Sequence, residues 1–244
     1  MLKKIFNKLK KQKNIELPFT TDIHSHLLPG IDDGVNTIEE SIDIIKGLKE
    51  LGIKKIITTP HIMSHRFPNN KSTIQDAYDV VKKELEKQNI SIDIQYASEY
   101  YYDDHFLDLI EKKDLLTIGD NYVLFEFSYH IKPTLLEQSV YKLIKYGYKP
   151  ILAHPERYRY YNSEEHYSRL KDMGLYFQIN SISMEGFYGK DVKKNVKKII
   201  SLGYVDFIGS DIHNKNYLTS YKKSLNNKIY NITIDNNIIK NDTL

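Results

Sequence analysis

Short apolar runs alternate with amphipathic segments along most of the chain, and this alternation limits its fold more than any other feature. Seven runs have the length and composition of β-strands, at residues 20–23, 55–59, 92–97, 122–127, 150–153, 176–180 and 207–209. Six segments between them have helical spacing, at residues 37–51, 72–88, 103–113, 134–146, 164–173 and 191–202. Several of these segments end at a glycine shortly before the next strand, as helices commonly do. The pattern predicts parallel strands joined by crossover helices.

The number of strand–helix units and the length of the chain suit one barrel. The chain has 244 residues, and a single (β/α) barrel uses about that many. We therefore predict an α/β protein with one distorted (β/α)7 barrel as its single domain, over residues 19–221. Residues 1–18 form a basic N-terminal extension in this scheme. Residues 222–244 are rich in Asn, Lys and Ile, and no structure is predicted for them because the alternation weakens there.

The charge of the chain is unevenly distributed. The net charge is +3, but residues 1–13 hold six of the 35 basic side chains and no acidic one. The rest of the chain therefore carries 29 basic against 32 acidic groups, which does not suit a general nucleic-acid-binding protein. Within residues 1–13, four apolar side chains recur at helical spacing: Leu2, Ile5, Phe6 and Leu9. This segment is either a solvated helix or a helix that contacts a membrane surface or a partner.

Two further features of composition bear on the compartment and on metal chemistry. The sequence has no cysteine, so disulfides and thiolate metal sites are excluded and any metal must be bound by nitrogen and oxygen. No apolar run approaches the length of a membrane span, and no secretory signal is recognisable at the N-terminus. We expect a cytoplasmic protein, with peripheral membrane contact through residues 1–13 as the alternative described above.

Histidines and carboxylates gather where the predicted strands end. Six of the seven strands finish in or near such a residue: His24, His26, Asp32 and Asp33 after the first, then His61, Glu99, Glu126, His154 with Arg157 behind it, and Asp211 with His213 after the last. The carboxyl ends of barrel strands meet at one mouth, where the active sites of such barrels lie. Each residue taken alone has an ordinary explanation, and a single His-x-His pair is a weak signal. Glu126 is the exception, because a buried carboxylate is costly unless it meets a cation or a proton.

The donor set of these residues indicates the metal. Imidazoles and carboxylates together suit Mn, Fe or Zn better than Ca or Mg, which prefer oxygen alone. Nine ligands are too many for one ion, so two or three closely spaced ions are expected. Such a site suits the hydrolysis of a phosphoester, because metal ions neutralise charge on the phosphoryl group.

Several motifs resemble one known group of proteins. The stretches DIHSHLLPGIDDG, TPH, SEY, AHPER and SDIHN resemble the PHP (polymerase and histidinol phosphatase) superfamily, and within it the CpsB/CapC family of manganese-dependent protein-tyrosine phosphatases of capsule and exopolysaccharide systems. The matches run from Asp22 to Asn214. The resemblance implies a PHP-type barrel and a three-metal centre. It also implies the ligand set His24, His26, Asp33, His61, Glu99, Glu126, His154, Asp211 and His213.

The resemblance also suggests residues that act on the phosphate. Arg157, in HPER, is at the position of a phosphate-contacting arginine, and Asp33 is counted with the catalytic residues as well as the ligands. Members of the family often have a second arginine shortly after Asp-x-His, where this chain has Lys215. A lysine offers a point charge without the planar fork of arginine. We therefore count Lys215 and also Arg66, in TPHIMSHRF, as candidates for phosphate contact.

The expected function is hydrolysis of phosphotyrosine in proteins, with a membrane-associated bacterial tyrosine kinase as partner and no nucleic acid. Three alternatives stay open: a small-molecule phosphatase of the histidinol-phosphate type, a phosphodiesterase, and a non-catalytic, metal-stabilised subunit that binds the kinase. An aromatic cluster beside Glu99 could flank a phenyl ring or could simply pack the loop onto the barrel. Its members are Tyr100, Tyr101, Tyr102 and Phe106.

Overall fold

A computed structural model describes residues 17–244 of the chain; the basic segment 1–13 lies outside these residues. The strands are β1 (Thr21–Asp22), β2 (Lys55–Thr58), β3 (His61–Ile62), β4 (Asp93–Tyr96), β5 (Glu99–Tyr101), β6 (Tyr122–Glu126), β7 (Lys149–Ala153), β8 (Tyr176–Asn180) and β9 (Phe207–Gly209). The helices are α1 (Ile38–Glu50), α2 (Lys71–Lys87), α3 (Asp104–Lys112), α4 (Leu136–Lys145), α5 (Glu164–Asp172), α6 (Lys190–Ser201), α7 (Lys215–Ser224) and α8 (Lys228–Asn236). Three short 3-10 helices complete the structure: η3 (Pro155–Arg157), η4 (Ser181–Glu185) and η5 (Asn241–Thr243).

All strand pairs are parallel, as the alternation predicts. Strands β1, β2 and β4 pair in that order, and β3, β5, β6, β7, β8 and β9 pair in a second series. The predicted strand at 55–59 corresponds to β2, and an unpredicted short strand, β3, follows beyond Pro60, which has no N–H to donate to a ladder. Beyond β4, a further short strand, β5, begins at Glu99.

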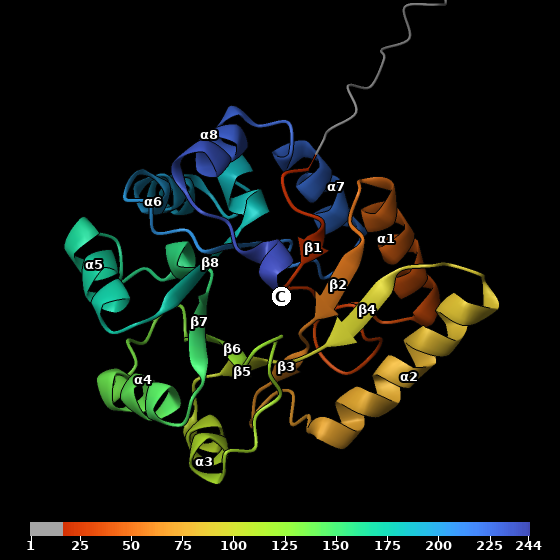
Figure 1. Cartoon of the computed structure of the whole chain (residues 1–244), viewed down its shortest axis with the longest axis horizontal. Coiled ribbons are helices and arrows are strands. Elements are labelled where there is room, and N and C mark those ends of the chain that lie inside the picture. The colour runs from red at the N-terminus through yellow and green to blue at the C-terminus, as the bar shows by residue number, and fades with distance from the viewer. Residues whose placement is uncertain (1–16) are drawn as a thin grey trace, which may run out of the picture.

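The two series join into one ring. Beyond β1, Ser25 forms a parallel bridge with Ile212, just after β9. The His26 amide donates to the Ile212 carbonyl at 2.9 Å, and the Asp211 amide donates to the His24 carbonyl at 2.8 Å. The helices lie around the outside of this ring (Figure 1). The α/β fold with parallel strands is therefore confirmed, and the ring is consistent with the expected (β/α)7 barrel.

Side chains on successive strand residues point alternately inward and outward, and two buried clusters result. The smaller cluster contains Ile57, Leu124, Ile151 and Phe207 from four strands, and Leu244 packs against it. The larger cluster contains the neighbours Ile56, Val123, Leu152 and Ile208, together with the apolar faces of the helices. The last residue of the chain lies near the centre of the ring in Figure 1. Hydrophobic burial thus holds the strands from both sides.

Residues 222–244, for which no structure was predicted, are folded against the barrel. Helix α8 begins after Asn227, whose side chain accepts from the Ile229 amide. The Asn241 side chain is fully buried and connects β1 to β9, because its Nδ2 donates to the Thr21 carbonyl at 2.8 Å and the Ile208 carbonyl at 2.7 Å. Its Oδ1 accepts from the Ile208 amide at 3.0 Å. We call this contact the Asn241 seam.

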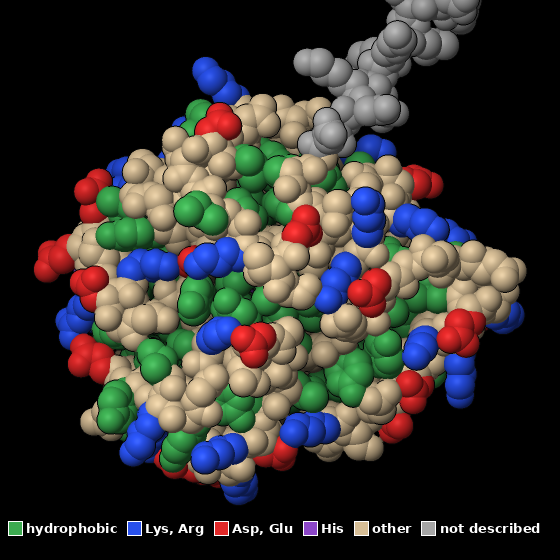
Figure 2. Space-filling model, viewed as in Figure 1, with side chains coloured by type: hydrophobic (Ala, Val, Ile, Leu, Met, Phe, Trp, Pro, Cys, Tyr) green, Lys and Arg blue, Asp and Glu red, His purple; other side chains and the backbone are tan. Residues whose placement is uncertain are grey.

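The outer surface described here is polar and of mixed charge. On the face shown in Figure 2, Lys, Arg, Asp and Glu side chains are interspersed and no histidine is seen. Among residues 17–244, no helix is both long and apolar enough to cross a membrane.

Candidate metal centre and active site

Nine side chains from the ends of the strands converge in the structure. His24 and His26 follow β1, His61 begins β3, Glu99 begins β5 and Glu126 ends β6. The remaining four lie in loops, and the whole set, which we call the strand-end cluster, is His24, His26, Asp33, His61, Glu99, Glu126, His154, Asp211 and His213. All but Asp33 and His213 are nearly fully buried. The structure therefore brings together every residue that the resemblance implied as a ligand; their role as ligands stays a prediction.

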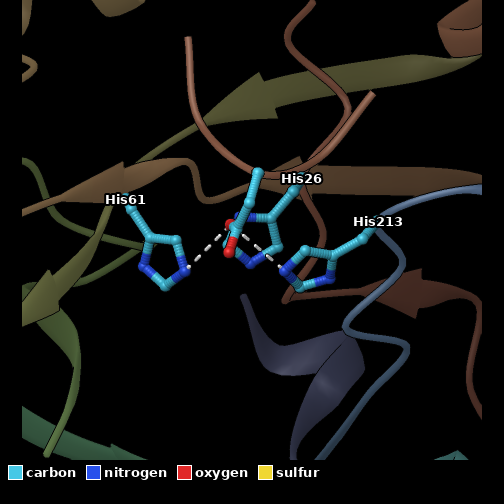
Figure 3. Close-up of side chains that lie close together, drawn as sticks. His26, His61 and His213 are labelled. Atoms are coloured by element: carbon cyan, nitrogen blue, oxygen red, sulfur yellow. Dashed lines mark ion pairs between the residues drawn. The ribbon is translucent and has the colours of Figure 1, made fainter. Parts of the chain in front are cut away.

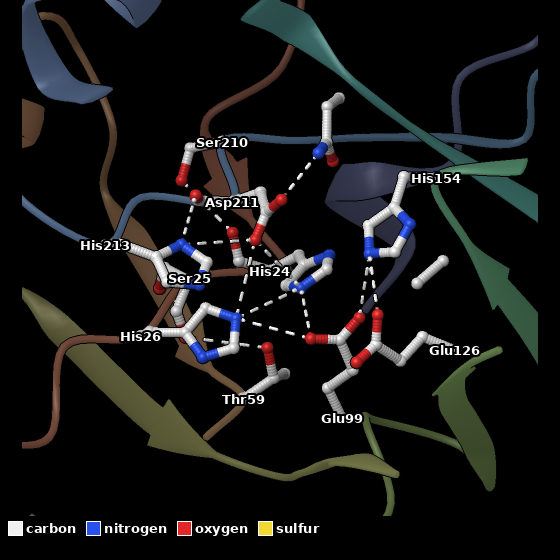
Figure 4. Close-up of polar contacts among 12 residues, drawn as sticks. His24, Ser25, His26, Thr59, Glu99, Glu126, His154, Ser210, Asp211 and His213 are labelled. Carbon is white, nitrogen blue, oxygen red and sulfur yellow. Dashed lines mark hydrogen bonds and ion pairs between the residues drawn. The ribbon is translucent and has the colours of Figure 1, made fainter. Parts of the chain in front are cut away.

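The Glu99 carboxylate faces His24, His26 and His154 (Figure 4). One of its carboxylate oxygens is 3.1 Å from His24 Nε2, 3.3 Å from His26 Nε2 and 3.4 Å from His61 Nδ1. The other oxygen is 3.0 Å from His154 Nε2. Burial alone would raise the pKa of Glu99, but the surrounding histidines hold it well below its usual value. A carboxylate with both oxygens among four imidazoles is placed to bridge cations.

Two further carboxylates complete the arrangement. Asp33 Oδ1 lies 3.5 Å from both His61 Nε2 and His213 Nε2, on the side shown in Figure 3. Asp211 Oδ1 lies 3.4 Å from Nε2 of His24 and 3.4 Å from Nε2 of His26. The same Asp211 oxygen lies 3.5 Å from His213 Nδ1, so His213 lies between the two carboxylates.

The cluster fits divalent metal ions. Three sets of its donor atoms each lie within 4.8 Å of one another: His26, Asp33, His61 and His213; His24, His26, Glu99 and Asp211; and His61, Glu99 and Glu126. In the last set, His61 Nδ1 is buried and has no hydrogen-bond partner in the described part of the chain. It faces Glu126 Oε1 at 3.7 Å, so a cation between them would satisfy both.

The protonation equilibria of the cluster also favour a bound cation. Burial and the neighbouring Glu99 raise the pKa of Glu126 well above its usual value. Burial opposes the charged form of His24, but Glu99 and Asp211 outweigh it and raise its pKa to about 9. Without metal, therefore, Glu126 and His24 favour their protonated forms. Metal ions supply the same positive charge and displace those protons.

An outer layer of polar groups orients the histidines. Gln178 Oε1 lies 2.8 Å from His24 Nδ1, and Asp32 Oδ2 lies 2.7 Å from His26 Nδ1. These bonds leave the Nε2 atoms free to face the centre, which is how metal-binding imidazoles are usually held. Sequence reasoning did not find Gln178. Its only signal is a polar residue at an inward position of a buried strand.

Two members of the cluster have a strained backbone. His154 has φ 35° and Asp211 has φ 50°, which is the left-handed region that residues other than glycine rarely adopt. His154 follows directly on β7 and Asp211 lies two residues beyond β9, so both are in the turns at the barrel mouth. Strain of this kind persists only where surrounding contacts hold it, and it concentrates at functional sites.

Arg157 is held between two tyrosine rings beside the cluster. Its guanidinium carbon lies 4.4 Å from the ring centre of Tyr129 and 4.2 Å from that of Tyr188. Its Nη1 donates to Asp211 Oδ2 at 3.2 Å, and burial is outweighed by these neighbours, which raise the pKa of Arg157 above its usual value. The tyrosine hydroxyls in turn bond Glu126 at 3.0 Å and Asp211 at 3.3 Å. The sequence gives no local signal for either tyrosine, because both come from loops distant along the chain.

The other two candidates for phosphate contact differ in position. Arg66 lines the same mouth, with its guanidinium 3.8 Å from Asp33 Oδ2 and its side chain 65% exposed. Lys215 instead pairs with Asp43 of α1 at 2.7 Å. It is absent from the described residues that line the mouth. The prediction for Lys215 therefore finds no support in its placement.

The mouth itself is a cavity of about 560 Å³. The aromatic side chains that line it are Phe67, Tyr101, Phe127, Tyr129 and Tyr217. Of the aromatic cluster expected to flank a substrate ring, only Tyr101 takes part. Tyr100 and Phe106 are buried and stacked on each other at 5.1 Å, so they pack α3 onto the barrel, as the alternative explanation held.

Comparisons with known proteins agree with this geometry. Residues 20–236 match the family model described as capsular polysaccharide synthesis, CpsB/CapC. Tyrosine-protein phosphatase YwqE of Bacillus subtilis (strain 168) is 32% identical over 195 residues, which cover 79% of this chain and 77% of that protein. Tyrosine-protein phosphatase CpsB of Streptococcus pneumoniae is 32% identical over 200 residues, which cover 79% of this chain and 82% of that protein.

Solved structures give the same result. The crystal structures of YwqE from Bacillus subtilis and CpsB from Streptococcus pneumoniae, described as metal-dependent tyrosine phosphatases, include a chain that matches with a TM-score of 0.75 at 28% identity. The match covers 90% of this chain and 96% of that one. An amidohydrolase from Mycoplasma synoviae, at 13% identity and a TM-score of 0.55, shares the fold alone.

Proposed function

Since the chain belongs to the CpsB/CapC family, we propose that it is a metal-dependent phosphatase that hydrolyses phosphotyrosine in proteins. The observation that carries the proposal is the strand-end cluster, in which five histidines and four carboxylates surround one mouth. A cluster of that size, with Glu99 between four imidazoles, exceeds what one structural ion needs. It suits a hydrolytic centre with two or three ions.

We assign the nine side chains of the strand-end cluster as the ligands of these ions. Manganese is the favoured metal, because the sequence resembles a family of manganese-dependent phosphatases. Iron and zinc are alternatives, because mixed imidazole and carboxylate donors suit all three metals. When bound, the ions would polarise the phosphoryl oxygens and make water more acidic and more nucleophilic. The protein supplies the arrangement: Asp32 and Gln178 orient two of the imidazoles, and Asp33 lies at the solvent-facing side of the mouth.

Arg157 is proposed to bind the phosphate. One of its N–H groups bonds Asp211, and the guanidinium has further donors in the same plane. The guanidinium carbon lies over both tyrosine rings, which fix the group beside the cluster and leave its remaining donors available to a phosphate. A planar fork of this kind matches the oxygens of a phosphate.

The aromatic lining of the mouth supports an aryl substrate. Tyr101 and Tyr217 line the same cavity as the cluster and offer apolar surface to a phenyl ring. The leaving group of phosphotyrosine is a phenolate with a pKa of about 10, and an alkyl ester needs more help from an acid. His65 and His130 line the mouth and are the residues best placed to supply a proton to a more basic leaving group.

We further propose that the substrate is a membrane-associated bacterial tyrosine kinase, on the strength of the capsular polysaccharide description of the family. Such kinases use ATP inside the cell, which places the enzyme in the cytoplasm. Residues 1–13, with six lysines, would add attraction to an anionic membrane surface. Flotation of full-length protein with anionic vesicles, compared with a variant that lacks residues 1–13, tests that contact. Failure of the full-length protein to float at low salt would leave the segment as a solvated tail or as an element that docks a protein partner.

The function is tested with metal-stripped protein that is resupplied with Mn, Zn, Fe or Mg. Phosphotyrosine and phosphoserine peptides of matched sequence are assayed beside histidinol phosphate. We expect activity to return with Mn and kcat/KM to be highest for the phosphotyrosine peptide. If histidinol phosphate were the best substrate, the small-molecule alternative would replace our proposal. If no metal restored turnover of any substrate, the protein would be a binding subunit.

A further inference from the structure

A second cavity lies beside the mouth and continues from it. It has a volume of about 850 Å³ and runs between the loop after η3 and the first three turns of α6. Tyr129, His130 and Arg157 line both cavities. A substrate peptide whose phosphotyrosine reaches Arg157 therefore lies next to this cavity. We call it the α6 groove.

The α6 groove is basic, although the body of the chain is not. Residues 14–244 carry 29 basic and 32 acidic side chains. The groove, by contrast, is lined by five basic side chains: Arg157, Arg159, Lys190, Lys194 and Lys198. Its two acidic side chains are Glu156 and Asp191. Of the two acids only Asp191 is exposed. Glu156 is fully buried and accepts from the Asn180 amide at 2.9 Å and the Ser183 hydroxyl at 2.7 Å. A local excess of one charge in a concave surface attracts the opposite charge.

The spacing of the lysines fits an extended peptide. Lys190, Lys194 and Lys198 follow at intervals of four residues and so lie along one face of α6. Such residues are about 6 Å apart along a helix axis. Alternate side chains of an extended chain point the same way and are separated by about 6.6 Å. Three lysines would therefore meet acidic side chains at alternate positions of a segment of about five residues.

We infer that the α6 groove binds acidic residues at alternate positions beside the phosphotyrosine of the substrate. This inference rests on the proposed function and adds a preference for sequence. A membrane surface is the less favoured partner, because the lysines line a concavity that continues into the mouth. Arg157 would then bind the phosphate of the substrate peptide, and the α6 groove would bind the carboxylates that flank the phosphotyrosine.

The test compares phosphotyrosine peptides that carry Asp or Asn at alternate positions on either side of the phosphotyrosine. We expect the metal-loaded wild type to favour the Asp peptides by roughly five- to tenfold in kcat/KM, mainly through KM, because a few exposed ion pairs give about that much. The preference should shrink as salt is added. The double variant Lys190→Glu/Lys194→Glu should reverse it. Lys197→Glu is the matched control, because Lys197 is an exposed residue of the same helix and is absent from the described residues that line the groove.

Several results would overturn the inference. Equal kcat/KM for Asp and Asn peptides in the wild type would do so, and so would an unchanged preference in the double variant. Hydrolysis of p-nitrophenyl phosphate, which is too short to reach the groove, reports whether each variant keeps a working active site. If no phosphopeptide were hydrolysed, the proposed function would fail, and fluorescence anisotropy with a labelled, unphosphorylated Asp peptide would still test the groove. Binding of anionic vesicles that the double variant abolishes, without any peptide preference, would assign the groove to a membrane.

Discussion

At the scale of single residues, Glu99 and Arg157 have separable tasks. Glu99 contacts four imidazoles, whereas Arg157 contacts one carboxylate and has further donors. We expect Glu99→Gln to lower the metal content and abolish phosphatase activity, because it removes the central negative charge. Arg157→Ala should retain the metal and lose about 2–4 kcal/mol of transition-state stabilisation. Metal analysis and kcat measured on the same samples distinguish the two.

Glu111→Gln provides the control for these variants, because Glu111 is an exposed carboxylate of α3 that, in the described part of the chain, pairs only with Lys142 and Tyr146. It should leave both metal content and rate unchanged. Normal metal content and full turnover in Glu99→Gln would refute the assignment of the centre.

Tyr188 offers a test of how Arg157 is positioned. Its ring covers one face of the guanidinium at 4.2 Å, and its hydroxyl is 3.3 Å from Asp211. Tyr188→Phe keeps the ring, so most of the activity should remain. Tyr188→Leu removes the ring and should cost about 0.5–2 kcal/mol in kcat/KM. Metal content should stay constant in both, and equal losses in the two variants would show that the ring has no such role.

Some residues of the site could be predicted from the sequence, and others could not. Histidines and carboxylates at strand ends converge in any barrel of parallel strands, so these residues could be named in advance as candidates, and the family resemblance selected the nine members of the strand-end cluster, with Asp33 and without Asp32. Tyr129, Tyr188 and Gln178 could not be, because their positions depend on how loops and inward-facing strand residues pack. The motif around Lys215 did not reveal that Asp43 of α1 would pair with this lysine.

At the scale of elements, periodicity located most strands and helices. The runs 176–180 and 207–209 coincide with β8 and β9. The sequence did not indicate α7 and α8, since their segments are rich in Asn, Lys and Tyr and have little apolar periodicity. The one local signal is an asparagine before each helix, Asn214 and Asn227, whose side chain accepts from the first turn.

The Asn241 seam is the element-scale contact most open to experiment. Asn241→Ala would leave two carbonyl groups and the Ile208 amide without partners in a buried position. Each such group costs about 1–3 kcal/mol, so we expect the free energy of unfolding to fall by at least that amount. Urea unfolding followed by circular dichroism measures the change.

Asn226→Ala is the matched control for the seam, because Asn226 is exposed just after the end of α7 and its side chain, within residues 17–244, bonds only the Lys222 carbonyl of that helix. Its effect should lie within about 0.5 kcal/mol. If both variants unfolded at the same urea concentration as wild type, the seam would not contribute to stability.

At the scale of the whole molecule, metal and fold are coupled. The ligand set draws on loops and strands from the first strand to the last, and without metal it places buried carboxylates and histidines against one another. A ligand that binds only the folded protein adds about 2.7 kcal/mol of stability at a concentration of 100 times its Kd. Removing metal with a chelator should therefore lower Tm, and adding Mn should restore it. Glu99→Gln should show a much smaller response, and an identical response would place the stabilising metal elsewhere.

The closure of the ring between β1 and β9 has a consequence for synthesis of the protein. His24 meets Asp211 only after nearly the whole barrel has left the ribosome, since the two residues are 187 positions apart. At about 5–20 residues per second, the interval is roughly 10–40 s. During that time the growing chain carries its first histidines without their last partners. The metal centre is therefore incomplete until translation is almost finished, and a chain that is cut short before β9 lacks Asp211 and His213 altogether.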